Sequence, residues 1–300
     1  MFPSKKVLIT GIDGFTGNHL AAYLEKKGML VYGTTITPSP ASNHYQCDLR
    51  EYDQIVEIVE VVIPDYVVHL AAISFSAETD RTLIYDTNII GTENLLKALH
   101  NSSYVPQKII IASSASVYGN QEIFELHENL CPQPVNHYGV SKLAMEHIVQ
   151  TYFDKLNILI VRPFNYTGPG QGLHFLIPKI VEHYKQKFPT IKLGNLDVAR
   201  EFNDIRFVVD TYYQLMMIPN ISDIVNLCTG ITWKLTDILN LMNDISNHKL
   251  HISISPELCR PNEIKVLNGS PSKLFSLITP DLRYSMNDTL SSIYNDNNIC

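Results

Sequence analysis

The stretch KVLITGIDGFTG, residues 6–17, predicts the fold of this chain. Lys6–Thr10 is a short apolar run of the kind that forms a buried strand, and glycines follow it at positions 11, 14 and 17. Glycines after a strand let the backbone turn tightly and approach a pyrophosphate, which rests on the N-terminus of the next helix, expected here over residues 17–27. The spacing is GxxGxxG, not the GxGxxG of the common dinucleotide fingerprint, so an ordinary glycine-rich turn is the alternative.

The rest of the first half alternates apolar strands with amphipathic helices. Strands are expected at 30–34, 66–70, 109–113 and 158–162, and helices at 52–62, 88–100 and 138–153. This βαβ alternation predicts an α/β fold with a doubly wound parallel sheet, a Rossmann domain. We expect that dinucleotide-binding domain over residues 1–165 and a smaller C-terminal substrate-binding lobe over 166–300. Part of 205–246, with a strand at 224–229 and a helix at 235–246, is expected to return to the first domain.

Two further segments carry residue types suited to proton transfer. Tyr138 and Lys142 form a YxxxK pair, and residues four apart lie on the same face of a helix. A nearby ammonium favours the phenolate, so Lys142 is expected to lower the pKa of Tyr138 towards neutral pH. Ser114 follows the strand at 109–113, where its hydroxyl can bond a substrate oxygen at the carboxyl end of the sheet. Chance spacing on an exposed helix and a serine-rich turn are the alternatives.

Composition excludes several other classes. The 300 residues are 45% hydrophobic and 18% charged, which allows a sizeable core. Five cysteines without CxxC or Cys/His spacing argue against both a disulfide framework and a metal site. A net charge of −7 argues against nucleic-acid binding. No apolar stretch approaches the roughly 20 residues that span a bilayer, and no signal-peptide core is present, so no membrane association and a cytoplasmic location are expected.

The glycine turn, the serines about 100 residues later and the YxxxK pair together resemble the extended short-chain dehydrogenase/reductase family, also called the NAD-dependent epimerase/dehydratase family. The resemblance covers nearly the whole chain. It implies an NAD(P)-dependent nucleotide-sugar oxidoreductase, a homodimer, in which Ser114, Tyr138 and Lys142 are catalytic.

The resemblance also implies a set of cofactor-binding positions. They are Gly11, Gly14, Phe15, Thr16, Gly17, Thr34, Thr35, Asp48, Leu49, Leu70, Ala71, Ala72, Asn88, Tyr138, Lys142 and Pro163. At the end of the second strand an acidic residue would bond the 2′-hydroxyl of NAD, and an arginine would hold the 2′-phosphate of NADP. Thr34 and Thr35 stand there instead, so the choice between NAD and NADP stays open. For Asn88 the alternative is a helix cap.

Residues 162–170 resemble the family's segment that leads from the cofactor to the sugar nucleotide. Two later segments, at 193–204 and 259–263, resemble GDP-mannose 4,6-dehydratases and GDP-4-keto-6-deoxy-D-mannose reductases. This implies a GDP-linked sugar as substrate, with Arg260 on the diphosphate and Glu263 on the guanosine ribose. The expected substrate-binding residues are Ser74, Ser116, Asn165, Asn195, Arg200, Arg260 and Glu263. Surface ion pairs of the two arginines with Glu201 or Glu263 are the alternative.

The expected reaction follows from a residue that is missing. Dehydratases of this family carry an acidic residue two positions before the tyrosine of the SxxxYG segment, and this chain has Ser116 there. Neither Ser116 nor His174 matches the cysteine and histidine of 3,5-epimerising relatives. We therefore expect reduction of GDP-4-keto-6-deoxy-D-mannose to GDP-D-rhamnose. A nucleotide-sugar 4-epimerase or C4 dehydrogenase with tightly bound NAD is the alternative, and a catalytically silent nucleotide-binding scaffold is a third hypothesis.

Overall fold

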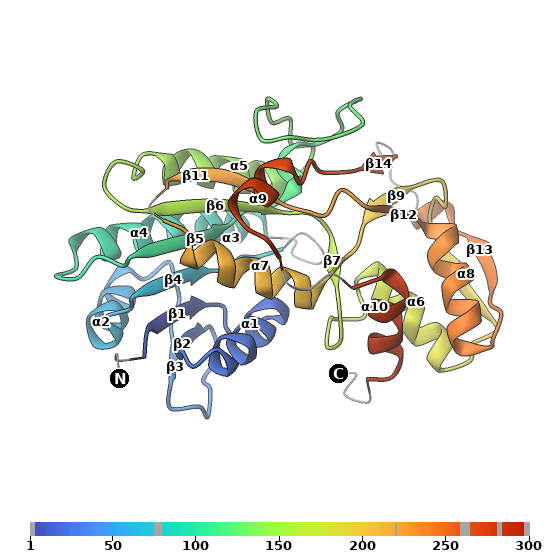
Figure 1. Ribbon diagram of the computed structural model, residues 1–300, viewed down its shortest axis with the longest axis horizontal. Helices are drawn as coiled ribbons and strands as arrows, with labels where there is room; N and C mark the ends of the chain where they lie inside the picture. Colours follow the sequence, from blue (N-terminus) through green and yellow to red (C-terminus); the bar gives the residue numbers. More distant parts are fainter. Residues whose placement is uncertain (1–3, 75–79, 220, 259–264, 281–283, 297–300) are drawn as a thin grey trace.

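The computed structural model describes residues 4–74, 80–219, 221–258, 265–280 and 284–296 (Figure 1). Its centre is a seven-stranded sheet in the order β3-β2-β1-β4-β5-β6-β11, and every pairing is parallel. The strands are β1 (Lys6–Thr10), β2 (Leu30–Thr35), β3 (His44–Gln46), β4 (Tyr66–His69), β5 (Lys108–Ala112), β6 (Ile158–Pro163) and β11 (Asp223–Leu227). The predicted doubly wound α/β fold is confirmed.

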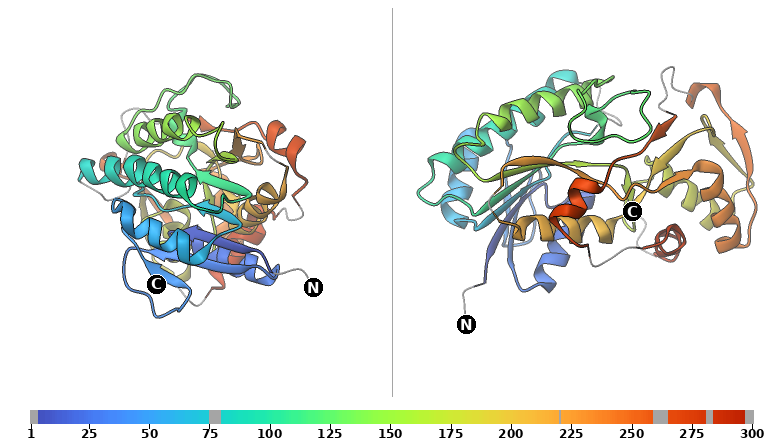
Figure 2. Two further views of the ribbon diagram at one scale, coloured as in Figure 1. Left: turned by 90° about the vertical axis from the view of Figure 1, so that its left-hand side faces the viewer. Right: turned by 45° about the horizontal axis from the view of Figure 1, so that its top comes forward.

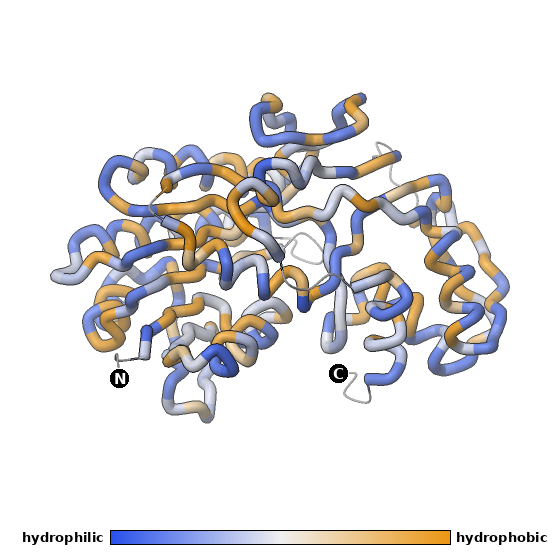
Figure 3. Tube along the Cα trace, in the orientation of Figure 1, coloured by the Kyte–Doolittle hydropathy of each residue, from blue (hydrophilic) through white to orange (hydrophobic). Residues whose placement is uncertain are grey.

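Helices cover both faces of this sheet (Figure 2). One face packs against α1 (Phe15–Lys26), α7 (Ile205–Met217) and α9 (Ser272–Leu277), and the other against α2 (Tyr52–Val62), α4 (Gly91–Asn101) and α5 (His137–Gln150). On β5, Ile110 belongs to the first core, whereas Ile109 and Ile111 belong to the second. Because side chains alternate between two buried faces, the strands read as continuous apolar runs, visible as hydrophobic segments in Figure 3.

Shorter elements join these layers near the carboxyl edge of the sheet. A single long helical segment after β4 consists of α3 (Arg81–Tyr85), the π-helical turn η1 (Asp86–Ile90) and α4. The 3-10 turn η2 (Ala115–Val117) follows β5. A π-turn inside a helix often marks a functional site, and η1 contains Asn88.

A second lobe lies beside the sheet (Figure 1). It contains α6 (Leu176–Lys185), α8 (Leu235–Ser246), α10 (Met286–Tyr294) and η3 (Pro256–Leu258). Its strands pair as β8 (Thr190–Leu193) with β13 (His251–Ile254), and as β12 (Thr232–Lys234), β9 (Ala199–Glu201) and β14 (Val266–Leu267) in one small sheet. A further pair, β7 (Tyr166–Thr167) and β10 (Asn203–Asp204), links the segments that follow β6 and β9.

Two expectations about the returning segment have different outcomes. α7 and β11 do lie against the central sheet, and β11 forms its edge beside β6. The expectation that the helix at 235–246 returns to the first domain is wrong, because the apolar face of α8 packs against α6 and α10. Periodicity revealed that α8 has an apolar face but not which core receives it. The short polar strand β3 was not predicted.

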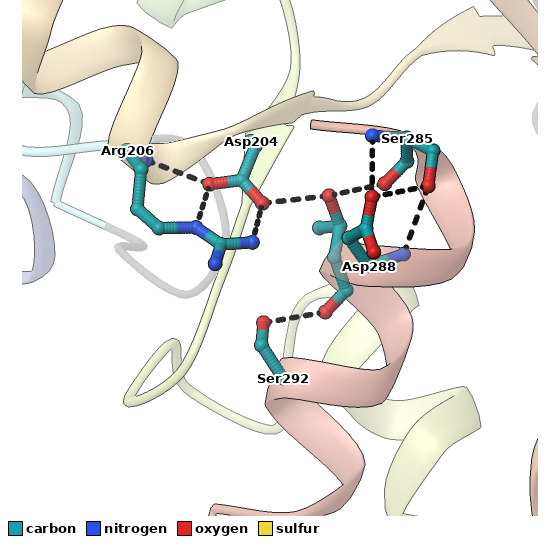
Figure 4. Close-up of polar contacts among 6 residues, drawn as sticks. Asp204, Arg206, Ser285, Asp288 and Ser292 are labelled. Atoms are coloured by element: carbon teal, nitrogen blue, oxygen red, sulfur yellow. Dashed lines mark hydrogen bonds and ion pairs between the residues drawn. The ribbon is translucent and has the colours of Figure 1, made fainter. Parts of the chain in front are cut away.

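Asp204 ties the second lobe to the sheet domain (Figure 4). Its carboxylate caps α7 by accepting from the Arg206 main-chain N at 2.8 Å, and it also accepts from the Arg206 side chain. The second carboxylate oxygen accepts from Thr289 Oγ1 of α10 at 2.7 Å. α10 itself begins with a capping box between Ser285 and Asp288. One buried carboxylate thus joins the start of a sheet-covering helix to the C-terminal helix of the other lobe.

Candidate active site

The carboxyl ends of the parallel strands bring most of the expected cofactor residues to one edge of the sheet. Since all seven strands run the same way, the turns after β1, β2, β3, β4, β5 and β6 open on that edge. The expected residues at the strand ends, in these turns or in the helical turns that follow directly are Gly11, Gly14, Phe15, Thr16, Gly17, Thr34, Thr35, Asp48, Leu49, Leu70, Ala71, Ala72, Ser74, Ser114, Ser116, Pro163 and Asn165.

The turn after β1 has the backbone of an anion cradle. Gly11 has φ +69°, and a Cβ there would lie 2.9 Å from Ala71 Cα. A Cβ on Gly17 would lie 2.3 Å from Gly11 O, so only glycine fits at this position. No side chain caps α1, whose N-cap is Gly14, and its first turn carries no acidic residue. The N–H groups at this helix start are therefore suited to a pyrophosphate, and the residues present fit a dinucleotide.

A buried histidine links this turn to the helix after β4. His69 contacts Thr10 Oγ1 through Nδ1 at 2.7 Å and Thr92 Oγ1 through Nε2 at 2.8 Å. The Thr92 hydroxyl donates to Asn88 O, so it must accept from Nε2–H of His69. Nδ1 then accepts from Thr10, which leaves a neutral imidazole, and burial indeed lowers the pKa of His69 to about 3. This series of hydrogen bonds fixes the end of β1 relative to η1 and α4.

Asn88 extends these hydrogen bonds to α5, the helix that carries Tyr138 and Lys142. Its amide oxygen accepts from Ile73 N at 2.9 Å, and its amide nitrogen donates to Ile73 O and to Ser141 Oγ. Ser141 Oγ in turn donates to Tyr138 O. Asn88 is therefore not a helix cap. It holds the segment after β4 against the first turn of α5.

Ser114, Tyr138 and Lys142 come together where α5 crosses the end of β5. Asn136 starts the helix by accepting from Gly139 N at 2.8 Å. Lys142 is buried, donates to Ala112 O at 2.7 Å, and its Nζ lies 6.0 Å from the centre of the Tyr138 ring. Ser114 lies near enough to Tyr138 to lower the pKa of its hydroxyl. The three residues expected to be catalytic are thus neighbours.

The electrostatics of this group differ from the expectation. Burial raises the pKa of Tyr138 to about 12, with a further increase from Tyr166, and Ser114 opposes it. Burial lowers the pKa of Lys142 to about 8, opposed by Glu146. The expectation that Lys142 lowers the pKa of Tyr138 is wrong here, because burial penalises the phenolate more than any attraction favours it. Tyr138 therefore keeps its proton at neutral pH, in the form that can protonate an alkoxide.

Ser116 lies beside this group on η2. Its hydroxyl accepts from Ser114 Oγ at 3.0 Å, and its main-chain N donates back to Ser114 Oγ at 3.1 Å. The position where dehydratases carry an acidic side chain thus holds a hydroxyl that orients Ser114.

The turns after β2 and β3 show which side chains are free for the adenosine end of a dinucleotide. Thr34 and Thr35 are buried, and Thr35 Oγ1 donates to Thr37 O at 2.6 Å. Ile36, by contrast, is 61% exposed. Asp48 is held by Arg50, whose Nε and Nη2 donate to its carboxylate at 3.0 and 2.5 Å and lower its pKa. The hydroxyl of Thr35 is therefore engaged within its own turn.

On the substrate side, two of the three expected segments run together. Asn203 N donates to Asn165 O, and β10 pairs with β7. Asn195 and Arg200 lie in the second lobe, where Arg200 Nη1 donates to Ala199 O and Lys265 O. Arg260 and Glu263 lie outside the described residues.

Glu201 is not the surface partner that the ion-pair alternative for Arg200 required. Glu201 is fully buried, and its carboxylate accepts from Gly269 N at 2.7 Å and from Thr229 N at 2.9 Å. It thereby joins β9 to the loops that precede β12 and α9.

Tyr166 is a site residue that sequence reasoning missed. Its hydroxyl lies 2.7 Å from Thr16 Oγ1, and its ring stacks on Phe15 at a centroid distance of 6.1 Å. Tyr166 thus contacts the glycine turn and also raises the pKa of Tyr138. The chain separates Tyr166 from Thr16 by 150 residues, and no local pattern signals the contact.

Within the described ranges, no three His, Cys, Asp or Glu side chains are arranged to hold a metal ion. The helices in the same ranges include none with the length and apolar character needed to cross a membrane.

A doubly wound sheet with a glycine cradle and a Ser-Tyr-Lys group at its carboxyl edge defines a dinucleotide-dependent oxidoreductase of the short-chain type. Comparison with known proteins gives the family. The family model described as GDP-mannose 4,6 dehydratase matches residues 8–292. The chain belongs to this family, as the motifs of its sequence predicted.

Two curated relatives share most of their length with this chain. The GDP-6-deoxy-D-talose 4-dehydrogenase of Aggregatibacter actinomycetemcomitans is 37% identical over 281 residues, 93% of each protein. The GDP-6-deoxy-D-mannose reductase of Pseudomonas aeruginosa is 30% identical over 304 residues, 98% of this chain and 97% of that protein. The solved structure of RMD from Pseudomonas aeruginosa, complexed with NADPH, superposes with a TM-score of 0.86 at 29% identity, covering 97% of this chain and 98% of that one. The predicted NAD(P)-dependent nucleotide-sugar oxidoreductase is confirmed, with a GDP-sugar 4-dehydrogenase or reductase type of activity.

Proposed function

We propose that this chain reduces the 4-keto group of GDP-4-keto-6-deoxy-D-mannose with NADH or NADPH, giving GDP-D-rhamnose. The observation that carries the proposal is the grouping of Tyr138, Lys142 and Ser114 at the end of β5, with Ser116 where a dehydratase has its acid. The 30% identity to the GDP-6-deoxy-D-mannose reductase over nearly the full length supports it.

The roles of the side chains follow from their contacts. The glycine cradle after β1 would hold the pyrophosphate of a reduced dinucleotide, which would supply the hydride for C4 of the sugar. Tyr138 donates its hydroxyl proton to the oxygen that becomes an alkoxide, and Ser114 donates a hydrogen bond to the same oxygen. Lys142, fixed by Ala112 O, places its ammonium near the Tyr138 ring, where it would also be available to the ribose of a bound dinucleotide. The chain thus protonates the product oxygen from a group that is already neutral and protonated.

Dehydration of GDP-mannose needs an additional group that removes a proton or water at C5 and C6. Ser116 is a poor acid or base for this step, because a hydroxyl does not titrate near neutral pH. We therefore assign redox chemistry at C4 alone.

The opposite configuration at C4 is a second candidate. The talose 4-dehydrogenase is more similar to this chain than the reductase, at 37% against 30% identity. 6-Deoxy-D-talose and D-rhamnose are C4 epimers, so oxidation of either at C4 gives the same 4-keto sugar. Hydride delivery to one face of C4 gives GDP-D-rhamnose, and delivery to the other face gives GDP-6-deoxy-D-talose.

The test is to incubate the full chain with GDP-4-keto-6-deoxy-D-mannose and either NADH or NADPH. We expect loss of reduced-nicotinamide absorbance that depends on the sugar. Proton NMR then identifies the product, because H4 is axial with large couplings in rhamnose and equatorial with small couplings in 6-deoxytalose. GDP-mannose is the control and should not be dehydrated. Formation of a 4-keto sugar from GDP-mannose would overturn the proposal, and purification with retained NAD plus interconversion of C4 epimers would assign a 4-epimerase.

A further inference from the structure

A buried ion pair lies directly beneath Ser114 and Lys142. Glu146 is one turn after Lys142 on α5, and Arg162 is on β6, with side chains 0% and 3% exposed. Arg162 Nε donates to Glu146 Oε1 at 2.9 Å, and Nη2 donates to Oε2 at 2.6 Å. This two-bond geometry is the strongest arrangement of a guanidinium and a carboxylate.

The pair continues into both sides of the turn that carries Ser114. Ser113 Oγ donates to Glu146 Oε1 at 2.5 Å. Arg162 Nη1 donates to Tyr118 OH at 3.0 Å, and Tyr118 OH donates to Asn226 Oδ1 of β11 at 2.7 Å. The network therefore holds the carboxyl ends of three neighbouring strands and grips the chain one residue before and four residues after Ser114.

Stability alone is a weak reason for such a pair. Removing two charges from water carries a large free-energy cost, and apolar residues of similar volume are often at least as stabilising. The hydrogen bonds of this pair go instead to the residues that flank the site.

We propose that Glu146, paired with Arg162, is a positioning residue for C4 redox chemistry: through Ser113 it fixes the turn that presents Ser114, and its carboxylate, one helical turn from Lys142 on α5, favours the ammonium form of that lysine. The inference rests on the proposed function for the roles of Ser114 and Lys142, but the charge of Lys142 can be measured without any turnover.

Among the charged groups around Lys142, Glu146 is the one that favours its ammonium form. On α5 itself the neighbours are Glu146 and the neutral Tyr138. His69 of β4 faces Lys142 as a neutral imidazole. α3 and η1 carry two further titratable groups, and both have other partners. Tyr85 forms a hydrogen bond with His137, and Asp86 interacts with Arg50.

From β6 comes only Arg162, whose charge Glu146 balances within the described residues. Without the Glu146 carboxylate, Arg162 would be an unpaired buried cation near Lys142. A like charge disfavours the ammonium, so Lys142 would lose its proton at lower pH.

The main variant is Glu146→Gln, and the double variant Glu146→Gln/Arg162→Gln removes both charges. In Glu146→Gln we expect kcat to fall about 10- to 100-fold, as for a slightly misplaced reacting group, with KM for the sugar nucleotide within about twofold. In the profile of kcat against pH, the fall on the alkaline side (the alkaline limb) should occur about one pH unit lower. In the double variant the limb should return towards that of the unmodified protein while kcat stays low.

NMR of protein labelled at the lysine Cε carbons gives the second readout. The Lys142 signal, assigned by its loss in Lys142→Met, should titrate at lower pH in Glu146→Gln than in the unmodified protein. Asp65→Asn, which breaks the partly exposed pair with Lys5 at the opposite edge of the sheet, is the control and should change neither profile.

A lowered melting temperature in Glu146→Gln with an unmoved Lys142 titration would overturn the inference, since a purely structural role predicts that result. If Glu146→Gln does not fold, the uncharged double variant and Ser113→Ala carry the test. Either must then lower kcat without a matching rise in KM, and unchanged kcat would refute the positioning role. If the unmodified protein shows no C4 redox activity, the proposed function fails, whereas the NMR titration still decides the charge relationship.

Discussion

The Nζ atom of Lys142 lies 6.0 Å from the centre of the Tyr138 ring, one turn further along α5. Its hydrogen bond goes to Ala112 O at the end of β5. Burial moves the pKa values of the two residues apart, Tyr138 to about 12 and Lys142 to about 8. At neutral pH the site therefore holds a neutral phenol beside an ammonium ion, which suits proton donation during reduction.

This relationship predicts the pH dependence of reduction. The active form has Lys142 protonated, and its pKa is lowered, so the rate should be level near neutral pH and fall as pH rises through about 8. Lys142→Arg keeps a cation at all accessible pH values, and its lower rate should show no alkaline limb in this range. The kcat profiles of both proteins check this, and an identical limb in Lys142→Arg would assign it to another group.

Tyr138→Phe removes the proton donor and keeps the ring. We expect kcat to fall at least about 100-fold, the lower end for general acid catalysis, with dinucleotide affinity little changed. Tyr85→Phe is the matched control, because its hydroxyl bonds His137 at the start of α5 at 2.8 Å. Steady-state kinetics compare the two, and turnover of Tyr138→Phe near the normal rate would remove Tyr138 from the mechanism.

The exposed side chain after β2 should tune the choice of cofactor. Thr35 is engaged with Thr37 O, whereas Ile36 is exposed at the same strand end. Ile36→Arg should improve kcat/KM for NADPH relative to NADH about tenfold, since its fork can hold a 2′-phosphate, and Ile36→Asp should shift the ratio the other way. Equal changes with both cofactors in both variants would place Ile36 away from the 2′ position.

Glycine substitutions in the cradle should separate severe crowding from a merely tight contact. A Cβ on Gly17 would lie 2.3 Å from Gly11 O, but on Gly14 it would lie 3.3 Å from the same atom. Gly17→Ala should therefore weaken dinucleotide binding by at least about tenfold and lower the melting temperature, because an overpacked site costs about 1 to 3 kcal/mol. Gly14→Ala should be milder in both. Fluorescence titration with NADPH and thermal melts measure this, and equal effects would contradict the geometry.

Arg200 should contribute positive charge to the nucleotide half of the substrate. If it contacts the diphosphate, Arg200→Ala loses a charge-assisted bond of about 1.5 to 3 kcal/mol, roughly 10- to 150-fold in affinity for the GDP-sugar. Lys27→Ala, which removes a cation that lies over Tyr23 and Tyr213, is the control. Isothermal titration with GDP, UDP, CDP and dTDP tests the base at the same time. Preference for a base other than guanine would contradict the assignment of a GDP-sugar.

The sequence by itself determined the features that depend on short-range pattern. Apolar runs and helical periodicity predicted most strands and helices of the sheet domain, and the glycine spacing predicted the cradle after β1. The YxxxK spacing placed Tyr138 and Lys142 on one helical face, because a helix fixes the relation of residues four apart.

Only the tertiary structure decided the relationships between distant segments. Glu146 and Arg162 meet because α5 packs over β6, Tyr166 meets Thr16 across 150 residues, and α8 joins the core of the second lobe. The protonation of Tyr138 belongs here too, since burial, not the neighbouring lysine, sets its pKa. Desolvation depends on which segments cover a side chain, and this is a property of packing that local sequence pattern does not contain.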